Sequence, residues 1–594
     1  MYDLSRIPET VTAPRTDPIY NCHSYLTKVP VAAIEPFILA FTEPGEIVTD
    51  FFAGSGMTGL AAIRLGRRAE LSDISKLGRH IATGYSTNVN TSDFQAAAEA
   101  VASKARSAIG SFYTTRRHED NVSAEMVRTV WSFVYNCPSC QSPLIYFRSL
   151  SNKGAAPKKC SRCSFPFARR RWPRGLDVPV QVVCRNKHGR LIEQDVADLD
   201  QSMIQNASKD PRLAQVPTLI IDEAREMFSR SGLGKAGLRR TSDFFAPRNA
   251  IALLELWRAI NTLEDVPVRE KLRFVFTAIL PRASRRYQWS AQRPLNAQNQ
   301  TYYIAPVYYE WNIFELFQRK VEAALRSDEA LFQAAPLLLN ASEKNLNYEI
   351  ASADHLEHIS SGSIDYVFTD PPFGSNIFYS DMNLFHEAWL GETTDHQKEA
   401  VVYTTGKKKN GSNLRYEELL TAAFTEGFRI LRPGRFMSIV FGNSNGQIWG
   451  LVQRAIRQAG FDASPIHVAV LDKGQRSVKG LNSGSESVVT VDLILTVQKP
   501  LVSDVPPHVQ CLQNGDIRML VADAIRELSA EEGALGHSPS HVYARILRKA
   551  IQNHYVLDGL HLSDVLLSLR DAGYTTHPKT GLLVGLPSSA CAVA

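Results

Sequence analysis

The hydrophobic pattern near the amino terminus predicts a strand, a tight turn and a helix in succession. The apolar run EIVTDFF begins at Glu46 and is followed by the glycine turn AGSG and the helical segment MTGLAAIRLG. A second predicted strand then ends in AELSD. A strand, a glycine turn and a helix form the opening unit of an open α/β sheet, which binds nucleotide-like ligands at its strand ends.

The same alternation of strand and helix returns in the second half of the chain. The segments NYEIASAD and IDYVFTDPP are predicted strands, YEELLTAAFTEGFRIL is a predicted helix, and RFMSIVFGN is a further strand. The later segment SVVTVDLILTV is apolar almost throughout, which is typical of a strand buried on both faces. We therefore expect one α/β core assembled from residues 1–120 and 336–500.

Two other regions depart from this pattern. Residues 121–335 contain four paired cysteines, the helix-like segment PRNAIALLELWRAINTLED and stretches rich in arginine and aromatic residues, so we expect an insert there. Residues 501–594 contain DIRMLVADAIRELSA, HVYARILRKAIQNH and LSDVLLSLRDAG, whose amphipathic pattern predicts a small helical C-terminal domain. A chain of 594 residues has room for these four segments.

The composition agrees with a soluble globular protein, because 44% of the residues are hydrophobic and 21% are charged. The chain does not open with a basic segment followed by an apolar one, and no apolar stretch is long enough to cross a bilayer. We therefore expect a cytoplasmic location and no membrane partner. The net charge of +6 permits a polyanionic partner without requiring one.

The glycine turn indicates a ligand that approaches the backbone closely. Gly54 and Gly56 allow a sharp turn where a Cβ atom would clash, and with Gly59 they complete a G-x-G-x-x-G pattern. Asp73 ends the second strand, where its carboxylate is placed to accept both hydroxyls of a ribose. Both NAD and S-adenosylmethionine contain this ribose, so the turn alone leaves the two cofactors open, and a plain strand-to-helix turn is the simpler alternative.

A second motif, Asp370-Pro371-Pro372-Phe373, follows the apolar strand that ends in YVFT. Two prolines impose an extended turn with few donors, so the carbonyl groups and the Asp370 carboxylate are left as acceptors. Acceptors suit a substrate that carries an NH₂ group, and Phe373 is able to stack on a planar base. The alternative is a proline turn whose exposed aspartate caps a local element.

Together these segments resemble the N6-adenine/N4-cytosine DNA methyltransferases. HSYLTKVPVAAIEPFILAFTEPGEIVTDFFAGSGMTGLAAIRLGRRAELSDIS is similar to the motif X, I and II run of that family. SADHLEHISSGSIDYVFTDPPFGSNIFYSDMNLFHEAWL is similar to its motif III and IV run, and LRPGRFMSIVF resembles the next strand. Motifs X and I precede motif IV, as in the α arrangement, but the long insert lies before the motif III strand.

The resemblance implies a Rossmann-like S-adenosylmethionine-dependent methyltransferase core, an inserted domain and double-stranded DNA as the partner. Asp73 would hold the ribose of the cofactor, Asp354 its adenine amino group, and the motif X residues would close its methionine end. Asp370 and the Pro371 carbonyl would bind the target amino nitrogen, and Phe373 would stack on a base flipped out of the duplex. The implied cofactor-binding residues are Lys28, Pro30, Asp50, Phe52, Gly54, Gly56, Asp73 and Asp354, and the implied catalytic residues are Asp370, Pro371, Pro372 and Phe373.

The expected reaction is methyl transfer to adenine N6, because Asp stands first in the motif where N4-cytosine enzymes more often have Ser. An N4-cytosine enzyme is the near alternative, and a C5-cytosine enzyme is disfavoured because the chain contains no Pro-Cys pair. An RNA guanine-N2 methyltransferase also remains open, since DPPF followed by glycine occurs there too. A zinc-dependent nucleic-acid-binding protein without activity is a further alternative, and a restriction or phage-defence partner protein is compatible with the family.

The four paired cysteines predict a structural zinc site. Cys137 and Cys140 form one CxxC pair, and Cys160 and Cys163 form a second after an interval of 19 residues. This spacing is typical of a four-thiolate zinc ribbon, in which no ligand position is left for water. We therefore expect Zn²⁺ as a structural cofactor.

Arginines interleaved with aromatic residues suggest contacts to nucleic acid. Residues 169–174 read RRRWPR immediately after the ribbon, and a second cluster contains Arg282, Arg285, Arg286, Tyr287, Trp289 and Arg293. Such patterns fit phosphate contacts with base stacking, and a solvated basic face is the simpler alternative. Lys407, Lys408 and Lys409 are further candidates for phosphate contacts.

Overall fold

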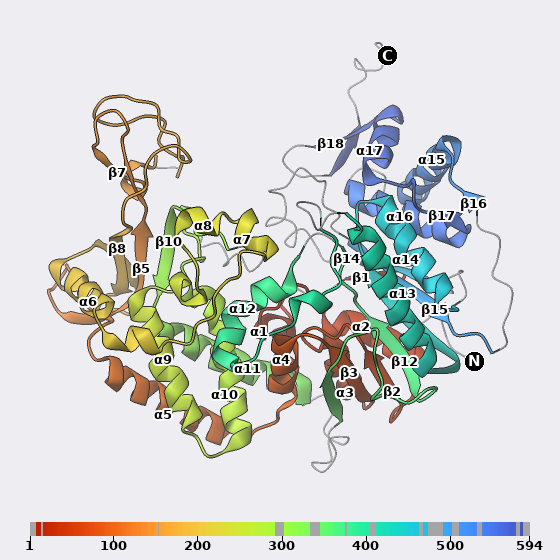
Figure 1. Cartoon of the computed structure of the whole chain (residues 1–594), viewed down its shortest axis with the longest axis horizontal. Coiled ribbons are helices and arrows are strands. Elements are labelled where there is room, and N and C mark those ends of the chain that lie inside the picture. The colour runs from red at the N-terminus through yellow and green to blue at the C-terminus, as the bar shows by residue number, and fades with distance from the viewer. Residues whose placement is uncertain are drawn as a thin grey trace.

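The computed structural model shows a mixed α/β protein (Figure 1). The structure describes residues 7–12, 16–151, 154–291, 302–332, 345–374, 377–403, 410–461, 467–472, 491–501, 510–531, 537–577 and 582–585. Among these residues, no helix is both long enough and apolar enough to span a membrane.

An eight-stranded sheet forms the centre of the fold, and its strand order is β1-β14-β15-β13-β12-β2-β3-β11. Neighbouring strands are parallel except for β15, which runs antiparallel to both β13 and β14. Strands from the first and second halves of the chain are therefore interleaved within one sheet. Their bounds are β1 Thr10–Thr12, β2 Ile47–Asp50, β3 Arg68–Asp73, β11 Leu346–Ile350, β12 Ile364–Thr369, β13 Leu431–Phe441, β14 His467–Asp472 and β15 Val491–Gln498.

Helices cover both faces of this sheet. Successive residues of a strand point to opposite faces, so a strand that is apolar throughout gives the sheet two apolar faces to bury. Tyr366 and Phe368 of β12 pack into one hydrophobic cluster, whereas Val367 between them packs into the other. The first cluster includes residues of α2 Val31–Phe41, α3 Met57–Arg64 and α4 Lys76–Ser86. The second includes residues of α13 Ser412–Ile430 and α14 Gly446–Gln458. The strands and helices predicted for the two halves of the core are present.

The insert contains an antiparallel sheet that the hydrophobic pattern did not predict. Its strand order is β10-β5-β8-β9, and β4 pairs with the start of β5. Its strands are β5 Ser123–Ser132, β8 Val178–Arg185, β9 Leu191–Asp195 and β10 Val307–Trp311, together with β4 Thr114–Arg116, which precedes the predicted start of the insert at residue 121. The helices of the insert are α6 Asp198–Ser208, α7 Glu226–Arg230, α8 Leu233–Ala236, α9 Pro247–Asn261, α10 Val266–Ala283 and α11 Ile313–Phe332, and α5 Thr91–Ile109, which precedes residue 121, packs on α9.

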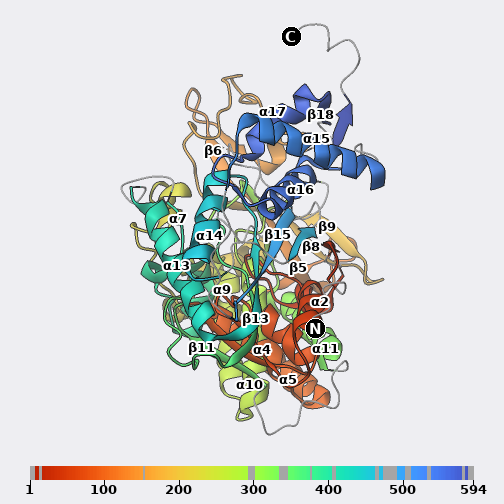
Figure 2. The same cartoon turned by 90° about the vertical axis from the view of Figure 1, so that its right-hand side faces the viewer.

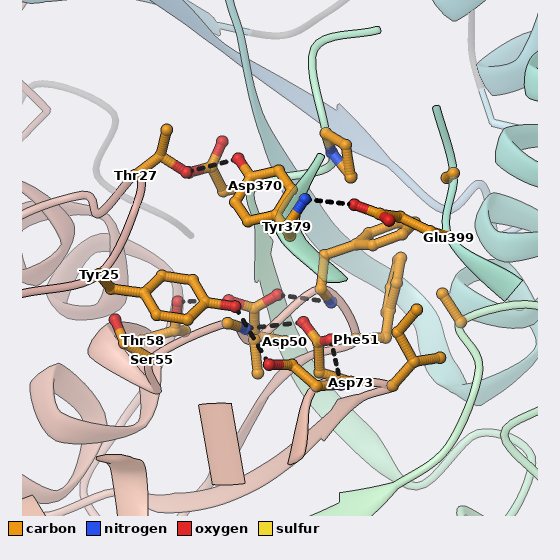
Figure 3. A pocket seen from close by; sticks show the side chains of 18 of the residues that line it. Tyr25, Thr27, Asp50, Phe51, Ser55, Thr58, Asp73, Asp370, Tyr379 and Glu399 are labelled. Atoms are coloured by element: carbon orange, nitrogen blue, oxygen red, sulfur yellow. Dashed lines mark hydrogen bonds between the residues drawn. The ribbon is translucent and has the colours of Figure 1, made fainter. Parts of the chain in front are cut away.

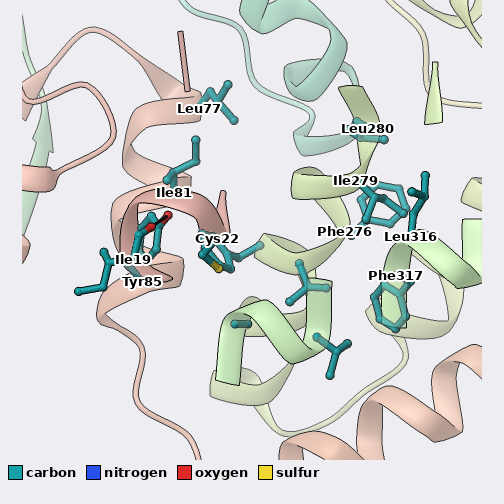
Figure 4. Close-up of a cluster of buried hydrophobic side chains, with 14 of the residues drawn as sticks. Ile19, Cys22, Leu77, Ile81, Tyr85, Phe276, Ile279, Leu280, Leu316 and Phe317 are labelled. Carbon is teal, nitrogen blue, oxygen red and sulfur yellow. Dashed lines mark hydrogen bonds between the residues drawn. The ribbon is translucent and has the colours of Figure 1, made fainter. Parts of the chain in front are cut away.

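A continuous hydrophobic cluster joins the insert to the central sheet. Figure 4 shows side chains of α1 Pro18–Cys22 and α4 facing side chains of α10 and α11. Cys22 and Tyr85 lie on one side of this contact and Phe276 and Phe317 on the other, and all four are buried. The insert is therefore packed against the core over a wide area.

Two further parts lie beyond these layers. Residues 134–176, which we call the ribbon arm, extend from the ends of β5 and β8 and contain β6 Val134–Asn136 and β7 Pro143–Ile145 (Figure 1). The C-terminal helices α15 Asn514–Glu531, α16 Pro539–Gln552 and α17 Leu562–Asp571 lie together at one end of the central sheet (Figure 2). Helix α16 packs on β14 and β15, so its apolar face belongs to the second cluster of the sheet.

Candidate functional site

A pocket opens where β2, β3 and β12 end, and most of the predicted site residues line it (Figure 3). Strands β2 and β12 are neighbours, so the glycine turn after one and the Asp-Pro-Pro-Phe turn after the other share an edge of the sheet. Four predicted residues lie outside the lining: Pro30, Gly56, Pro371 and Phe373. The predicted residues that line the pocket are Lys28, Asp50, Phe52, Gly54, Asp73, Asp354, Asp370 and Pro372.

The glycine turn has the conformation that its sequence predicts. Gly54 and Gly56 have φ angles of 49° and 81°, a region that side-chain-bearing residues rarely adopt. A Cβ atom on Gly56 would lie 2.6 Å from the Cβ of Ala82 in α4. Gly56 therefore serves helix packing, whereas Gly54 lines the pocket.

Asp50 is a buried junction between three elements. Its Oδ1 accepts hydrogen bonds from the Phe52 amide at 3.0 Å and the Thr369 hydroxyl at 2.8 Å, and its Oδ2 accepts one from the Thr58 hydroxyl at 2.8 Å. Burial raises the pKa of Asp50 to about 7 despite these hydrogen bonds. Its carboxyl group thus ties β2 to β12 and α3 beneath the pocket.

Asp73 presents its carboxylate at the end of β3. Oδ2 accepts a hydrogen bond from the Gly54 amide at 2.8 Å, and Oδ1 accepts one from the Ser75 amide at 2.8 Å. Burial raises the pKa of this carboxyl above its ordinary value. Each oxygen has a second lone pair, so the group is able to accept two further hydrogen bonds from a ligand.

Two buried acceptor atoms of the pocket have no hydrogen-bond donor within the described part of the chain: Oδ1 of Asp354 and Oδ1 of Asn383. The His355 imidazole lies beside the first, with 3.5 Å between its Nδ1 and Oδ1 of Asp354. Asn383, on α12 Tyr379–Leu390, donates through its amide nitrogen to the Ser75 hydroxyl at 3.1 Å. Buried acceptors without donors favour a ligand that supplies N–H or O–H groups.

The Asp-Pro-Pro-Phe turn has two of its carbonyl groups fixed by the protein. The Tyr416 hydroxyl donates to the Pro372 carbonyl, and the Asn443 amide donates to the Phe373 carbonyl at 2.7 Å. Among the described residues, none donates to the carbonyl of Pro371. The Phe373 ring is half-buried and meets Phe441 edge-on, with 5.1 Å between ring centroids.

A polar group beside Asp370 was not predicted. The Tyr379 hydroxyl hydrogen-bonds the Thr27 hydroxyl at 2.7 Å, and Figure 3 shows both near Asp370. Glu399 accepts hydrogen bonds from the Tyr379 amide at 2.6 Å and from Ser380, at the start of α12. Burial raises the pKa of Glu399 to about 7. Glu399 lies nine residues beyond the end of the motif IV run and belongs to no recognised motif, so only the three-dimensional fold reveals its role as a cap of α12.

The motif X residues lie at the pocket wall. Lys28 is buried, and its ammonium group donates to the backbone carbonyl of His23 at 2.7 Å and to that of Tyr20. Burial lowers the pKa of Lys28 to about 7. Pro30 precedes the first residue of α2. Through its two hydrogen bonds Lys28 holds the backbone of residues 20–23 against the segment that lines the pocket.

The four predicted zinc ligands converge in the ribbon arm. Their sulfur atoms all lie within 4.8 Å of one another, with 3.5 Å between Cys137 and Cys163 and 3.8 Å between Cys140 and Cys160. Tetrahedral zinc with bonds of about 2.3 Å places sulfur atoms roughly 3.8 Å apart, so the spacing fits this metal.

The two CxxC turns of the ribbon arm have the same local structure. Gln141 and Ser164, each directly after a CxxC pair, have positive φ angles of 57° and 61°. Their amides donate to the carbonyls of Cys137 and Cys160, the first cysteine of each pair. A strained backbone repeated at equivalent positions indicates that both turns are shaped around one centre.

The expectation that residues 282–293 contact nucleic acid is wrong for its central residues. Arg286 is 2% exposed, and its guanidinium lies 3.9 Å from the centre of the Phe385 ring. Tyr287 is buried, and Arg285 donates to the Asp243 carbonyl and pairs with Asp177. The Phe385 ring of α12 covers Arg286, whereas Arg285 and Tyr287 contact other residues of the insert, so these side chains stabilise the fold. Arg293 and Lys407, Lys408 and Lys409 lie outside the described residues.

Comparisons with known proteins find matches to DNA methylases, and the family match lies in the amino-terminal part of the chain. A family model described as a DNA methylase matches residues 2–88. The "Putative methylase YubD" of Escherichia coli (strain K12) is 52% identical over 42 residues, which are 7% of this chain and 18% of that protein. This chain therefore spans less than a fifth of the curated relative it matches.

Similar solved structures include a protein of Thermus thermophilus, TTHA0409, described as a "Putative DNA Modification Methylase". Its complex with S-adenosyl-L-methionine is 14% identical, with 37% of this chain and 91% of that chain covered and a TM-score of 0.17. Its selenomethionine derivative is 15% identical, with 32% and 80% covered and a TM-score of 0.16.

The fold is that of an α/β protein with a pocket at the carboxyl ends of its strands. The family match confirms the predicted resemblance to the N6-adenine/N4-cytosine DNA methylases, through the segment that contains the glycine turn and Asp73.

Proposed function

We propose that this protein is an S-adenosylmethionine-dependent DNA methyltransferase that modifies an exocyclic base amino group, most readily adenine N6. One observation carries the proposal: Asp73, Asp354 and Asp370, which come from three separate motifs, line a single pocket. A cofactor and an amino substrate must meet in one place for methyl transfer, and this pocket offers acceptors for both.

The residues of the pocket fit the cofactor. Asp73 has two lone pairs for the ribose hydroxyls, and the donor-free Oδ1 of Asp354 suits an adenine amino group. Gly54 leaves space for close approach, and Asp50 holds the glycine turn in place through its three hydrogen bonds. The bound cofactor would supply an electrophilic methyl group on its sulfonium.

The Asp-Pro-Pro-Phe turn fits the target amino group. An NH₂ group has two hydrogens; the Asp370 carboxylate offers one acceptor inside the pocket, and the Pro371 carbonyl, outside the pocket lining, would offer the second. Accepting both hydrogens draws the nitrogen lone pair out of conjugation with the ring and towards the methyl group. Positioning of this kind requires no covalent nucleophile. A base paired in a duplex reaches such a turn only after it is flipped out of the stack, where Phe373 would stack on it.

We further propose that the ribbon arm binds one structural Zn²⁺ through its four cysteines, within an insert of residues 121–335 between the two parts of a Rossmann-like core. The convergence and equivalent turns of the two CxxC pairs support this. The C-terminal helices would then form a smaller part, residues 501–594.

The test is expression in a host that lacks DNA methylation, followed by mapping of modified bases by long-read sequencing. We expect N6-methyladenine in a defined sequence context, and none from the Asp370→Ala variant. N4-methylcytosine would instead identify the near alternative. Unmodified DNA together with methylated guanine in RNA would favour an RNA guanine-N2 enzyme. No cofactor binding by calorimetry would refute the proposal and favour a nucleic-acid-binding protein without activity.

A further inference from the structure

The positive charge of the chain is concentrated in the ribbon arm. Residues 134–176 contain nine Lys and Arg residues and no Asp or Glu. The whole chain has 66 basic and 60 acidic residues, so the remainder has three more acidic than basic residues. The net charge of +6 therefore comes entirely from this arm.

Most of the basic side chains that the structure describes in this arm are exposed and have no carboxylate beside them, whereas Arg148 and Arg174 pair with Asp195 and Asp177. Six of them form no ion pair with any residue that the structure describes, in contrast to Arg212, Arg429 and Arg454 elsewhere, which pair with acidic neighbours. The six are Lys158, Lys159, Arg162, Arg169, Arg170 and Arg171. Exposed cations without acidic partners form a surface of high positive potential.

Three of the cations are held on one short turn with a rigid base. The amides of Arg171 and Trp172 both donate to the carbonyl of Ala168, so residues 169–171 lie on a single turn. The Trp172 ring is buried, meets Phe167 edge-on at 5.0 Å, and donates from its indole nitrogen to the Pro166 carbonyl at 3.1 Å. The turn is thus fixed to the ribbon from inside, while its charges face outwards.

We propose that the ribbon arm is the main duplex-DNA-binding surface of this protein and that it contacts the phosphate backbone. The proposal rests on the proposed function, which supplies DNA as the polyanion. Within the described residues the aromatic rings of the arm are mostly packed inwards, and Phe165 is its one exposed aromatic side chain, at 42%; the other large apolar side chain exposed there, Leu176, has no ring. A cationic surface without a stacking platform suits a duplex backbone better than unpaired bases. The arm then provides affinity, and the body of the protein the chemistry.

The experiment measures the salt dependence of binding to a duplex of about thirty base pairs by fluorescence anisotropy. The test variant is Arg169→Gln/Arg170→Gln/Arg171→Gln in the full-length chain. The matched control removes three exposed cations outside the arm, Lys209→Gln/Arg518→Gln/Arg570→Gln. Each lost phosphate contact lowers the salt slope by about 0.9, so the test variant should lose about 2.7. Its affinity near 0.1 M salt should fall by about two to three orders of magnitude, and the control should stay within a few fold.

A second variant guards against loss of fold in the arginine turn. Lys158→Gln/Lys159→Gln changes the segment before the second CxxC pair, outside the arginine turn, and should lower the slope by about 1.8 if both lysines contact phosphates. Cofactor affinity by calorimetry should be unchanged in every variant, because the pocket is untouched. If the unmodified protein did not bind the cofactor, the proposed function would be refuted. Failure of the proposed function is therefore distinguishable from failure of the DNA-binding proposal.

Three results would overturn the proposal. An unchanged salt slope in both arm variants would place the DNA elsewhere. An equal loss in the control variant would mean that net charge alone matters. Tighter binding of the arm to single-stranded RNA than to duplex DNA, measured by competition, would assign the surface to another nucleic acid.

Discussion

Substitution of Asp73 by Asn tests the cofactor site most directly. The carboxylate accepts one backbone amide on each oxygen, which leaves two lone pairs for the ribose hydroxyls. A hydrogen bond to a charged group contributes about 1.5–3 kcal/mol. Loss of the charge and of one acceptor oxygen should therefore weaken S-adenosylhomocysteine binding by about 3 kcal/mol, or roughly 150-fold.

The substitution also disturbs the protein, because the new amide nitrogen faces a backbone N–H. A ligand comparison separates this effect from the loss of ribose contacts. Calorimetry of S-adenosylhomocysteine and its 2′,3′-dideoxy analogue should show a loss of about 3 kcal/mol in the unmodified protein and less than about 1 kcal/mol in Asp73→Asn. Asp328→Asn is the matched control, since Asp328 pairs with Lys271 away from the pocket.

The reasoning would be refuted if removal of the hydroxyls reduced affinity equally in the unmodified protein and in Asp73→Asn. The ribose would then lie elsewhere, and Asp73 would serve only to hold the glycine turn to the segment after β3.

Three further outcomes are expected. Asp370→Ala should slow methyl transfer by at least about a hundred-fold, measured with radiolabelled cofactor, while calorimetry shows cofactor affinity within a few fold of the original. Cys137→Ser should abolish zinc content by metal analysis and unfold the ribbon arm, whereas Cys184→Ser should retain the metal; soluble, active protein without zinc would contradict this. Burial lowers the pKa of His386 to about 3, so the folded state binds fewer protons than the unfolded state and stability falls as the pH drops below about 6.5. Relative to the unmodified protein, His386→Phe should therefore gain about 2 kcal/mol in urea unfolding at pH 5 over its value at pH 7.5, and an equal difference at both pH values would contradict the burial argument.

Short sequence patterns predicted the strands and turns whose conformation depends mainly on residues adjacent in the sequence. Strands β2 and β3 and the turn between β2 and α3 follow from adjacent apolar residues, glycines and Asp73. Strand β12 and its proline turn follow in the same way. Their convergence in one pocket was predicted only through the family resemblance, because it depends on pairing between residues about 320 positions apart.

The elements that were missed depend on distant partners. Strand β5 pairs with β10, whose residues follow almost 180 positions later, and all five residues of β10 are buried, so no alternating pattern marks it. Arg286 was assigned to the surface because its neighbours in sequence are basic, but the Phe385 ring that covers it is about a hundred residues away. Glu399 and Asn383 are common polar residues in sequence and gain a role only from the helix they cap or occupy.

The interleaved strand order has a consequence for folding during synthesis. Strand β3 ends at Asp73 and its neighbour β11 begins at Leu346, so the ribosome must add about 270 residues before the sheet can extend. At roughly 5–20 residues per second this takes between about 15 s and a minute. The antiparallel sheet of the insert is complete once β10 has emerged at Trp311, before any strand of the second half exists. The nascent chain therefore presents a folded insert beside an unfinished sheet with open, apolar strand edges, which is the state most exposed to aggregation and to chaperone binding.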